Sequence, residues 1–284
     1  MKNLFAFKPE GFPLEAEGVS MGPLAVRLAR KDGEIEAAER LRYDIFYREY
    51  GAKPVGEIEK TQRDHDEFDD VADHLIVIDR RIDNIPERIV GTYRLIRSDM
   101  AKQIGRFYTS SEFDITKLIQ SGLNLGELGR SCVAAEYRTR SVLQLLWQGI
   151  AEYVTHHNIG ILFGCASFHG TNVDEHAEML SYLYHYHRAE DALCPKAIGE
   201  NAVDMNIIPK DQLDAKNALM KLPPLIKGYL RLGGHVGDGA FIDHQFNTID
   251  ICVVVKTGLV AKRYSKHYQR KVEGFPNNFP AEEE

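Results

Sequence analysis

The sequence contains no long apolar run and no closely spaced pair of cysteines. A transmembrane helix needs about 18 or more consecutive apolar residues, so none is expected. The beginning of the chain carries acidic residues and lacks the apolar segment and cleavage site of a secretory signal. The four cysteines form no CxxC pair, which predicts reduced, buried thiols instead of a disulfide framework or zinc site. These absences predict a cytoplasmic protein.

Basic residues are also fewer than acidic ones. The chain has 35 Lys and Arg against 42 Asp and Glu, a net charge of −7. A nucleic-acid-binding domain usually presents a basic surface, so we expect no nucleic-acid partner. The exception is the segment 262–271, which groups Lys262, Arg263, Lys266, Arg270 and Lys271. Two interpretations stay open for it: peripheral contact with anionic lipid at the inner membrane surface or with a carrier protein, or simply an exposed helical face.

Apolar runs and helical periodicity follow each other along the chain in a mixed α/β pattern with one main sheet. The strand signals lie at about 24–29, 74–79, 89–97, 125–134, 161–167 and 248–256. The helix signals lie at about 33–50, 115–120, 142–154, 174–187 and 225–232. We expect a single domain over 1–272, with a core at about 24–190, a C-terminal extension at about 191–272, and a disordered tail over 273–284.

The stretch Glu127–Ile150 is the most informative part of this pattern. A strand enters a tight polar turn at 136–141, and a helix with one apolar face follows directly. Such a turn directs free backbone N–H groups and the positive end of the helix dipole at one point. The stretch therefore predicts a phosphate-binding site.

The segment Val133–Leu146 resembles the acyl-donor loop of the GCN5-related N-acetyltransferase (GNAT) superfamily, V-x-P-x-Y-R-G-x-G-x-G followed by a helix. Tyr137 and Arg138 match this pattern, whereas Thr139, Ser141 and Leu143 stand where glycine is usual. Glycine lets the backbone lie against a pyrophosphate such as that of CoA. The missing glycines therefore favour a donor with a single phosphodiester, the phosphopantetheine thioester of acyl carrier protein.

Other segments resemble, in order and residue type, the acyl-homoserine-lactone synthases, which share this fold and use acyl carrier protein thioesters. These segments are Arg42-x-x-x-Phe46, Asp66-Glu67-Phe68-Asp69, Val90–Leu95 and Glu127–Arg130. The chain continues past the point where such synthases end, and its segment 222–255 is similar to bacterial L-ornithine Nα-acyltransferases. The resemblance implies a GNAT-like mixed central sheet flanked by helices and no permanently bound cofactor.

The same resemblance implies a reaction: transfer of a 3-hydroxyacyl chain from acyl carrier protein to the α-amino group of L-ornithine, giving lyso-ornithine lipid. Three alternatives remain at this point. They are an N-acyl amino acid synthase with another acceptor, an acyl-homoserine-lactone synthase, and a non-catalytic acyl-carrier or lipid-binding module.

Glu127 is the candidate base, because amide formation from a thioester needs a neutral amine and the α-ammonium of an amino acid must lose a proton. The alternative is a structural carboxylate paired with Arg94 or Arg130. We expect Glu127→Gln to abolish turnover and to leave folding intact.

The resemblance assigns acceptor binding to Arg42, Phe46, Asp66, Asp69, Arg94 and Arg130. Arg94 and Arg130 lie inside expected strands, where an unpaired charge is costly, so a buried network with Asp66, Asp69 or Glu127 is expected. The acidic loop around Asp66 and Asp69 also suits the second ammonium of ornithine, unless it is only a solvated acidic loop.

Tyr137, Arg138, Thr139, Arg140 and Ser141 are the candidate contacts to phosphopantetheine and acyl carrier protein, the alternative being a solvated basic turn. No metal is expected, because the spacing of the histidines at 169, 176, 185 and 187 matches no known metal motif.

Overall fold

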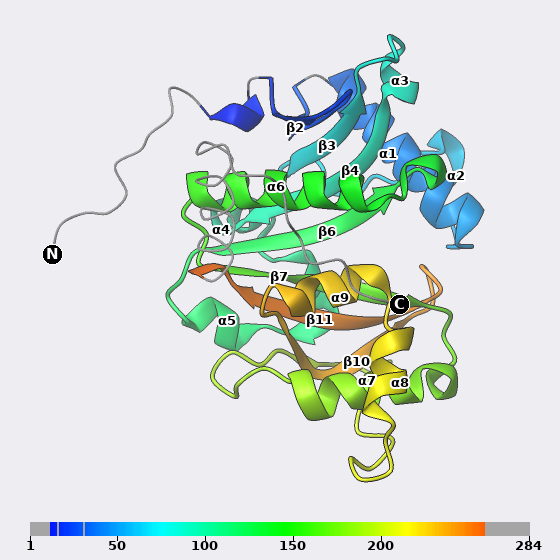
Figure 1. Ribbon diagram of the computed structural model, residues 1–284, viewed down its shortest axis with the longest axis vertical. Helices are drawn as coiled ribbons and strands as arrows, with labels where there is room; N and C mark the ends of the chain where they lie inside the picture. Colours follow the sequence, from blue (N-terminus) through cyan, green and yellow to red (C-terminus); the bar gives the residue numbers. More distant parts are fainter. Residues whose placement is uncertain (1–11, 16, 31, 259–284) are drawn as a thin grey trace, which may run out of the picture.

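The computed structural model describes residues 12–15, 17–30 and 32–258 (Figure 1). One mixed sheet runs through them in the order β1-β2-β3-β4-β6-β7-β11-β10-β8-β5, with β9 paired to β10. The strands are β1 Val19–Met21, β2 Leu24–Leu28, β3 Asp73–Asp79, β4 Ile89–Arg97, β5 Phe113–Asp114, β6 Leu125–Val133, β7 Ile161–His169, β8 Lys196–Ala197, β9 Ala202–Val203, β10 His235–Asp243 and β11 Thr248–Lys256.

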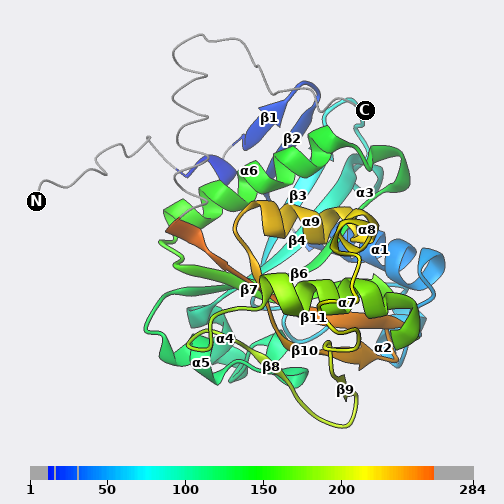
Figure 2. The same cartoon turned by 60° about the horizontal axis from the view of Figure 1, so that its bottom comes forward.

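Helices cover both faces of this sheet. They are α1 Asp32–Tyr43, α2 Glu57–Thr61, α3 Ile85–Arg88, α4 Ser98–Ile104, α5 Thr116–Gln120, α6 Arg140–His156, α7 Val173–His187, α8 Ala215–Lys221 and α9 Pro224–Arg231. Figure 2 shows α6, α9 and α7 on one face of the sheet. The residues of β3 alternate accordingly: Leu75 and Val77 join the apolar cluster under α6, whereas Ile76 and Ile78 join the cluster under α1.

The strand β11 lies in the interior of the sheet, between β7 and β10. Every residue of β11 from Thr248 to Lys256 has an antiparallel partner in β7, from His169 to Ile161. The C-terminal extension expected from the sequence therefore supplies central strands to the same sheet as the core. The helix α9 adds a second connection, because the ring of Tyr229 packs edge-on against Trp147 of α6 with centroids 5.1 Å apart.

The strands β6 and β7 run parallel but separate after a short paired section. The pairing covers Leu125 to Glu127 in β6 and Ile161 to Phe163 in β7. Beyond Glu127, β6 stays paired with β4, while β7 stays paired with β11. A gap therefore opens between two strands in the middle of the sheet.

Most predicted elements are present with small shifts of their ends. The predicted helix at 33–50 is α1 continued by a π-helical segment, Asp44–Glu49. The strand β10 was not predicted. The basic segment 262–271 and the expected tail at 273–284 lie outside the described residues. Within the described part of the chain, no helix combines the length and apolar character needed to cross a membrane.

Candidate active site

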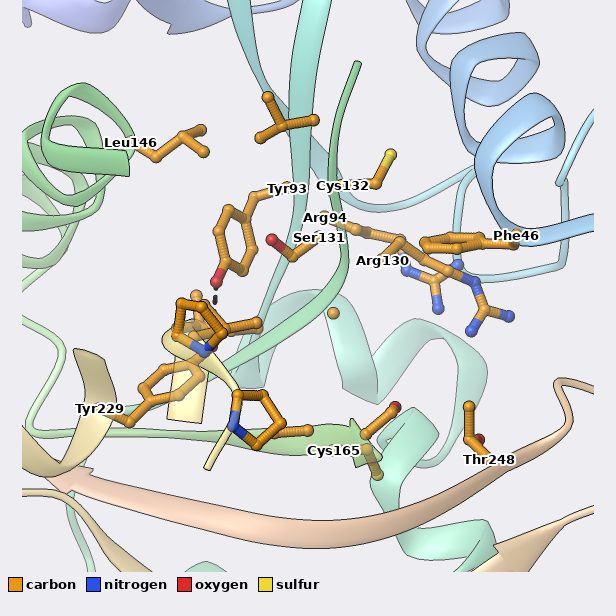
Figure 3. A pocket seen from close by; sticks show the side chains of 18 of the residues that line it. Phe46, Tyr93, Arg94, Arg130, Ser131, Cys132, Leu146, Cys165, Tyr229 and Thr248 are labelled. Atoms are coloured by element: carbon orange, nitrogen blue, oxygen red, sulfur yellow. Dashed lines mark hydrogen bonds between the residues drawn. The ribbon is translucent and has the colours of Figure 1, made fainter. Parts of the chain in front are cut away.

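A cavity of about 1280 Å³ occupies the gap between β6 and β7. Its walls come from segments far apart in the sequence: Phe46, β4, β6, the turn before α6, β7, the start of α9, and the hairpin of β10 and β11. Figure 3 shows Tyr93 and Tyr229 at one end and Phe46, Arg94 and Arg130 at the other. The hydroxyls of Tyr93 and Tyr229 lie 3.1 Å apart and join β4 to α9.

Glu127 lines the cavity at the point where β6 and β7 separate. Its side chain is almost completely buried. The two carboxylate oxygens accept backbone hydrogen bonds from the N–H of Tyr108 at 2.9 Å and of Thr109 at 2.6 Å. Burial raises the pKa of Glu127 above its ordinary value, although these hydrogen bonds oppose the shift. Glu127 therefore fixes the backbone at Tyr108 and Thr109, and its carboxylate also lines the cavity, where it could exchange a proton with a bound molecule.

A buried ionic network lies beside Glu127 and joins α1, the acidic loop, β4 and β6. Its members alternate in charge: Arg42, Arg94, Arg130, Asp64, Asp66 and Asp69. Arg42 binds Asp69 through two hydrogen bonds of 2.8 and 2.9 Å. Arg94 contacts Asp66 at 2.6 Å and Asp69 at 3.1 Å. The predicted network with Asp66 and Asp69 is thus present, and its arginines pair with aspartates of the loop.

This network is balanced, with three arginines facing three aspartates. Burial alone would raise the pKa of Asp69, but the charges of Arg42 and Arg94 hold it well below its usual range. The carboxylates of Asp66 and Asp69 are therefore already paired with cations inside the protein. They are poorly placed to serve as partners of an additional ammonium group.

Arg130 adopts a left-handed backbone conformation with φ of 50°, which is unfavourable for residues other than glycine. It lies where the pairing of β4 with β6 shifts register, between the pairs Arg94–Gly129 and Thr92–Cys132. Its guanidinium contacts Asp66 at 3.1 Å and stacks between the rings of Tyr108 and Phe246, 4.7 and 4.5 Å from their centroids. These contacts hold the strained residue and turn its side chain toward the cavity.

Phe46 lies at the same end of the cavity, on the π-helical segment after α1. Its ring packs edge-on against Phe246, with the centroids 6.0 Å apart. The neighbouring Tyr47 donates a hydrogen bond of 3.0 Å to Asp64 and so connects this segment to the ionic network.

The turn before α6 forms one rim of the cavity. Tyr137, Arg138, Thr139 and Arg140 line the cavity, whereas Ser141 is exposed and lies outside the lining. Arg138 forms two hydrogen bonds with Glu49, of 2.5 and 2.6 Å, so a bound phosphate would compete with this carboxylate. The hydroxyl of Thr139 accepts a 3.4 Å hydrogen bond from the N–H of Val142 and caps the helix.

A second group of acidic residues was missed by the sequence reasoning. Glu112, Asp243 and Asp250 come from the segment before β5, from β10 and from β11. Asp243 and Asp250 line the cavity, and ligand atoms of Glu112, Asp250 and Cys165 lie within 4.8 Å of one another. The sequence signal that could have revealed this group is Asp250, a single acidic residue inside the strand TIDICVVVK, most of which is apolar.

Two trios among the described residues bring possible metal ligands together. In the first, Glu39, His65 and Asp69, the side chains take part in ion pairs with one another or with arginines. In the second, Glu112, Cys165 and Asp250, burial raises the pKa of the Cys165 thiol well above its usual value. A protonated thiol is a poor metal ligand.

Known proteins resemble this chain in sequence over most of its length. Residues 41–148 match the model of an acetyltransferase (GNAT) domain. The L-ornithine Nα-acyltransferase of Rhodobacter capsulatus is 45% identical over 251 residues, which cover 88% of this chain and 96% of that protein. That of Rhizobium meliloti is 45% identical over 248 residues, covering 86% of this chain and 84% of that protein. The solved structure of the AHL synthase LasI aligns with 82% of this chain and 89% of the LasI chain. The sequence identity is 10% and the TM-score is 0.44. On the strength of the identities over most of both sequences, the chain belongs to the family of L-ornithine Nα-acyltransferases.

Proposed function

We propose that the protein transfers a 3-hydroxyacyl chain from acyl carrier protein to the α-amino group of L-ornithine, giving lyso-ornithine lipid. Membership in the family supports the reaction class and the acceptor. The observation that carries the proposal is the cavity itself. It connects the donor turn at 137–140 with Glu127 and with the arginines of the acceptor side.

The proposed chemistry needs one proton acceptor and no bound cofactor. The α-ammonium of ornithine gives a proton to Glu127, directly or through one water, and the free amine attacks the thioester carbon. The C–N bond forms as the C–S bond breaks, the attacking nitrogen loses its second proton as it becomes the amide, and the phosphopantetheine sulfur leaves as a thiolate that takes up this proton. The raised pKa of Glu127 makes it a stronger base than an exposed carboxylate.

The donor side supports a carrier-protein thioester over free CoA. The turn at 137–141 lacks the glycines that admit a pyrophosphate, and its residues at the cavity rim include Arg138 and Arg140. The start of α6 adds N–H groups and a positive dipole end suited to one phosphate. Peripheral membrane contact through the segment 262–271 stays a prediction outside the described residues.

The test supplies purified protein with 3-hydroxyacyl carrier protein and L-ornithine, and measures free thiol and acylated ornithine. The matching 3-hydroxyacyl-CoA serves as the alternative donor. We expect product from the carrier-protein donor and at least tenfold lower kcat/KM with the CoA donor. Absence of ornithine-dependent product would exclude the proposed function, and equal use of both donors would exclude the carrier-protein preference.

Glu127→Gln tests the proposed base, with Glu87→Gln on the exposed face of α3, away from the cavity lining, as the matched control. We expect kcat to fall about 10²- to 10⁴-fold in Glu127→Gln and to stay unchanged in the control. Folding of Glu127→Gln should not be fully intact, contrary to what the sequence alone suggested. Glutamine offers one acceptor oxygen to the two backbone N–H groups of Tyr108 and Thr109, whose hydrogen bonds the carboxylate of Glu127 accepts. A stability loss of about 1–3 kcal/mol is expected, so activity is compared below the melting temperature of the variant.

A further inference from the structure

Two buried polar atoms in the cavity wall form no hydrogen bond of standard geometry among the described residues, although the hydroxyls of Ser167 and Thr248 lie near the Asp250 carboxyl and lower its pKa. The two atoms are Oδ1 of Asp250 and Oγ1 of Thr248. Asp250 is 5% exposed and Thr248 is 6% exposed, and both line the cavity. The two residues are separated by one position on β11, so their side chains point to the same face of the strand. A buried carboxylate oxygen without a partner is costly unless a ligand supplies one.

The surroundings of Asp250 are acidic. Glu112 is 3% exposed, and Asp243 lines the cavity on the neighbouring strand β10. Within the described ranges, none of these three carboxylates takes part in an ion pair, in contrast with the aspartates that pair with Arg42, Arg94 and Arg130. Burial and the charge of Asp250 raise the pKa of Glu112 well above its usual value. The charge of Arg130 acts on both Glu112 and Asp250, but the ion pairs of Arg130 are with Asp64 and Asp66.

The acidic wall faces the arginine end of the cavity. In Figure 3, Cys165 and Thr248 lie on the side of β7 and β11, across from Arg94 and Arg130. An acceptor between the two walls meets arginine on one side and unpaired carboxylate on the other. A dibasic amino acid carries an additional ammonium on its side chain, which suits the wall whose carboxylates form no ion pair.

We infer that Asp250 and Thr248, with Glu112 and Asp243 behind them, bind the side-chain ammonium of the dibasic acceptor. The inference rests on the proposed acyl transfer and gives it a specificity site. An ammonium group donates three hydrogen bonds, and Oδ1 of Asp250 and the hydroxyl of Thr248 are buried acceptors that form no hydrogen bond of standard geometry, although Ser167 and Thr248 lie near enough to lower the pKa of Asp250. An acceptor without this ammonium leaves both atoms buried and unpaired, so it is selected against.

The test compares L-ornithine with L-norvaline, which has the same carbon chain and no side-chain ammonium. In the wild-type protein we expect kcat/KM to favour ornithine by at least 100-fold. In Asp250→Asn we expect kcat/KM for ornithine to fall about 10- to 100-fold, mainly through KM. The value for norvaline and the KM of the donor should change less than twofold. Asp211→Asn, in an exposed loop, is the matched control and should behave as the wild type.

Two results of this assay overturn the inference. One is a wild-type protein that uses norvaline as well as ornithine, which leaves acyl transfer intact and removes the ammonium site. The other is an Asp250→Asn variant that loses both acceptors equally. A requirement for a divalent metal, lost on chelation and restored by the metal, would assign the acidic wall to an ion and also overturn it.

Binding without turnover separates this inference from the proposed reaction. We expect ornithine, but not norvaline, to raise the melting temperature of the wild-type protein, and the shift to disappear in Asp250→Asn. If no acceptor releases thiol, the proposed function fails, while this binding experiment still decides the ammonium site. Thr248→Val provides a second variant should Asp250→Asn fail to fold, and it should weaken ornithine binding severalfold. An unchanged ornithine shift in a folded variant of either kind would contradict the inference.

Discussion

At the scale of single residues, the buried carboxylates fall into two groups with opposite surroundings. Asp69 is held between Arg42 and Arg94. Asp250 has an oxygen without a hydrogen-bond partner in the described structure, and its neighbours include Glu112 and Asp243. The first arrangement stabilises the fold around fixed charges. The second leaves a charge for a ligand to neutralise, at a cost to the unliganded protein.

Asp69→Asn should destabilise the protein strongly. The substitution leaves Arg42 and Arg94 buried with one anionic partner fewer, and breaking a buried ionic network in this way typically costs about 3–5 kcal/mol. The free energy of unfolding in urea measures the effect. Asp70→Asn is the matched control, because the side chain of Asp70 is 71% exposed and its removal should cost less than about 0.5 kcal/mol. Equal losses in the two variants would contradict the importance of the network.

Asp250→Asn should have the opposite effect on stability, developing above about pH 4 and complete above about pH 6. Burial and the charge of Asp243 raise the pKa of Asp250 to about 6, from about 3.9 in an unfolded chain. The raised pKa means that the folded state loses stability as the pH rises from 4 to 6, by about 3 kcal/mol for this group. Glu112, Cys165 and Arg130 also face this carboxyl.

The measurement is the free energy of unfolding at pH 4 and pH 7.5 without substrate. We expect the Asp250→Asn variant to be more stable than the wild type at pH 7.5 and about equally stable at pH 4. A variant that is less stable at both pH values would show that Asp250 stabilises the unliganded fold.

At the scale of secondary-structure elements, the cavity depends on how β7 passes β6. Gly164 follows Phe163, the last residue of β7 that pairs with β6, and a Cβ atom at Gly164 would lie 2.1 Å from the carbonyl oxygen of Leu128. The φ of Gly164 is +155°, which side-chain-bearing residues rarely adopt. The two backbones therefore touch exactly where the gap begins to open.

Gly164→Ala should cost at least about 3 kcal/mol of unfolding free energy, because neither backbone can move without breaking sheet pairing. Gly129→Ala in β6 is the control, since nothing lies within 4 Å of its added Cβ atom, and a change below about 1 kcal/mol is expected. Thermal unfolding of both variants gives the comparison. A stable Gly164→Ala protein would show that the strands can separate further without loss of the sheet.

The elements that could be predicted from sequence are those with strong periodicity. The strands β3, β4, β7 and β11 have apolar runs or alternation, and α6 has one continuous apolar face. The strand β10 was missed because its sequence, HVGDGAFID, contains two glycines and two aspartates, and its pairing with β11 shifts register between Val236 and Ala240.

Of the candidate site, the arginine network was predicted from the sequence and the acidic wall was not. The arginine network was found because charged residues inside expected strands stand out, and Arg94 and Arg130 are indeed buried beside Asp66 and Asp69. The acidic wall was missed because its members are separated along the chain and meet only when β10 and β11 join the sheet. No local pattern shows that Glu112 and Asp250 are neighbours.

At the scale of the whole molecule, the sheet order joins the expected core at 24–190 to the C-terminal extension through β11 and β10. A fragment 1–190 would lack β11 and β10 and would expose the full length of β7 as an unpaired edge. We expect this fragment to aggregate or to lack a cooperative unfolding transition. Near-UV circular dichroism and size-exclusion chromatography measure this.

Co-expression with the fragment 191–284 is the matched control for this truncation. We expect the two fragments to purify together, because β11 has a pairing partner for each of its residues in β7. A monomeric, cooperatively folded fragment 1–190 would contradict this expectation and would support the division into a core and an extension.

The position of β11 also bears on the order in which the protein is made. A ribosome releases the donor turn and Glu127 well before it releases Thr248 and Asp250, and domains fold as their chains emerge. During synthesis the nascent chain therefore contains the residues of its proposed base and phosphate site before it contains those of the opposite wall of the cavity. The wall that we infer selects the acceptor is the last part to be assembled, so a nascent chain gains acceptor selectivity only when its sheet is complete.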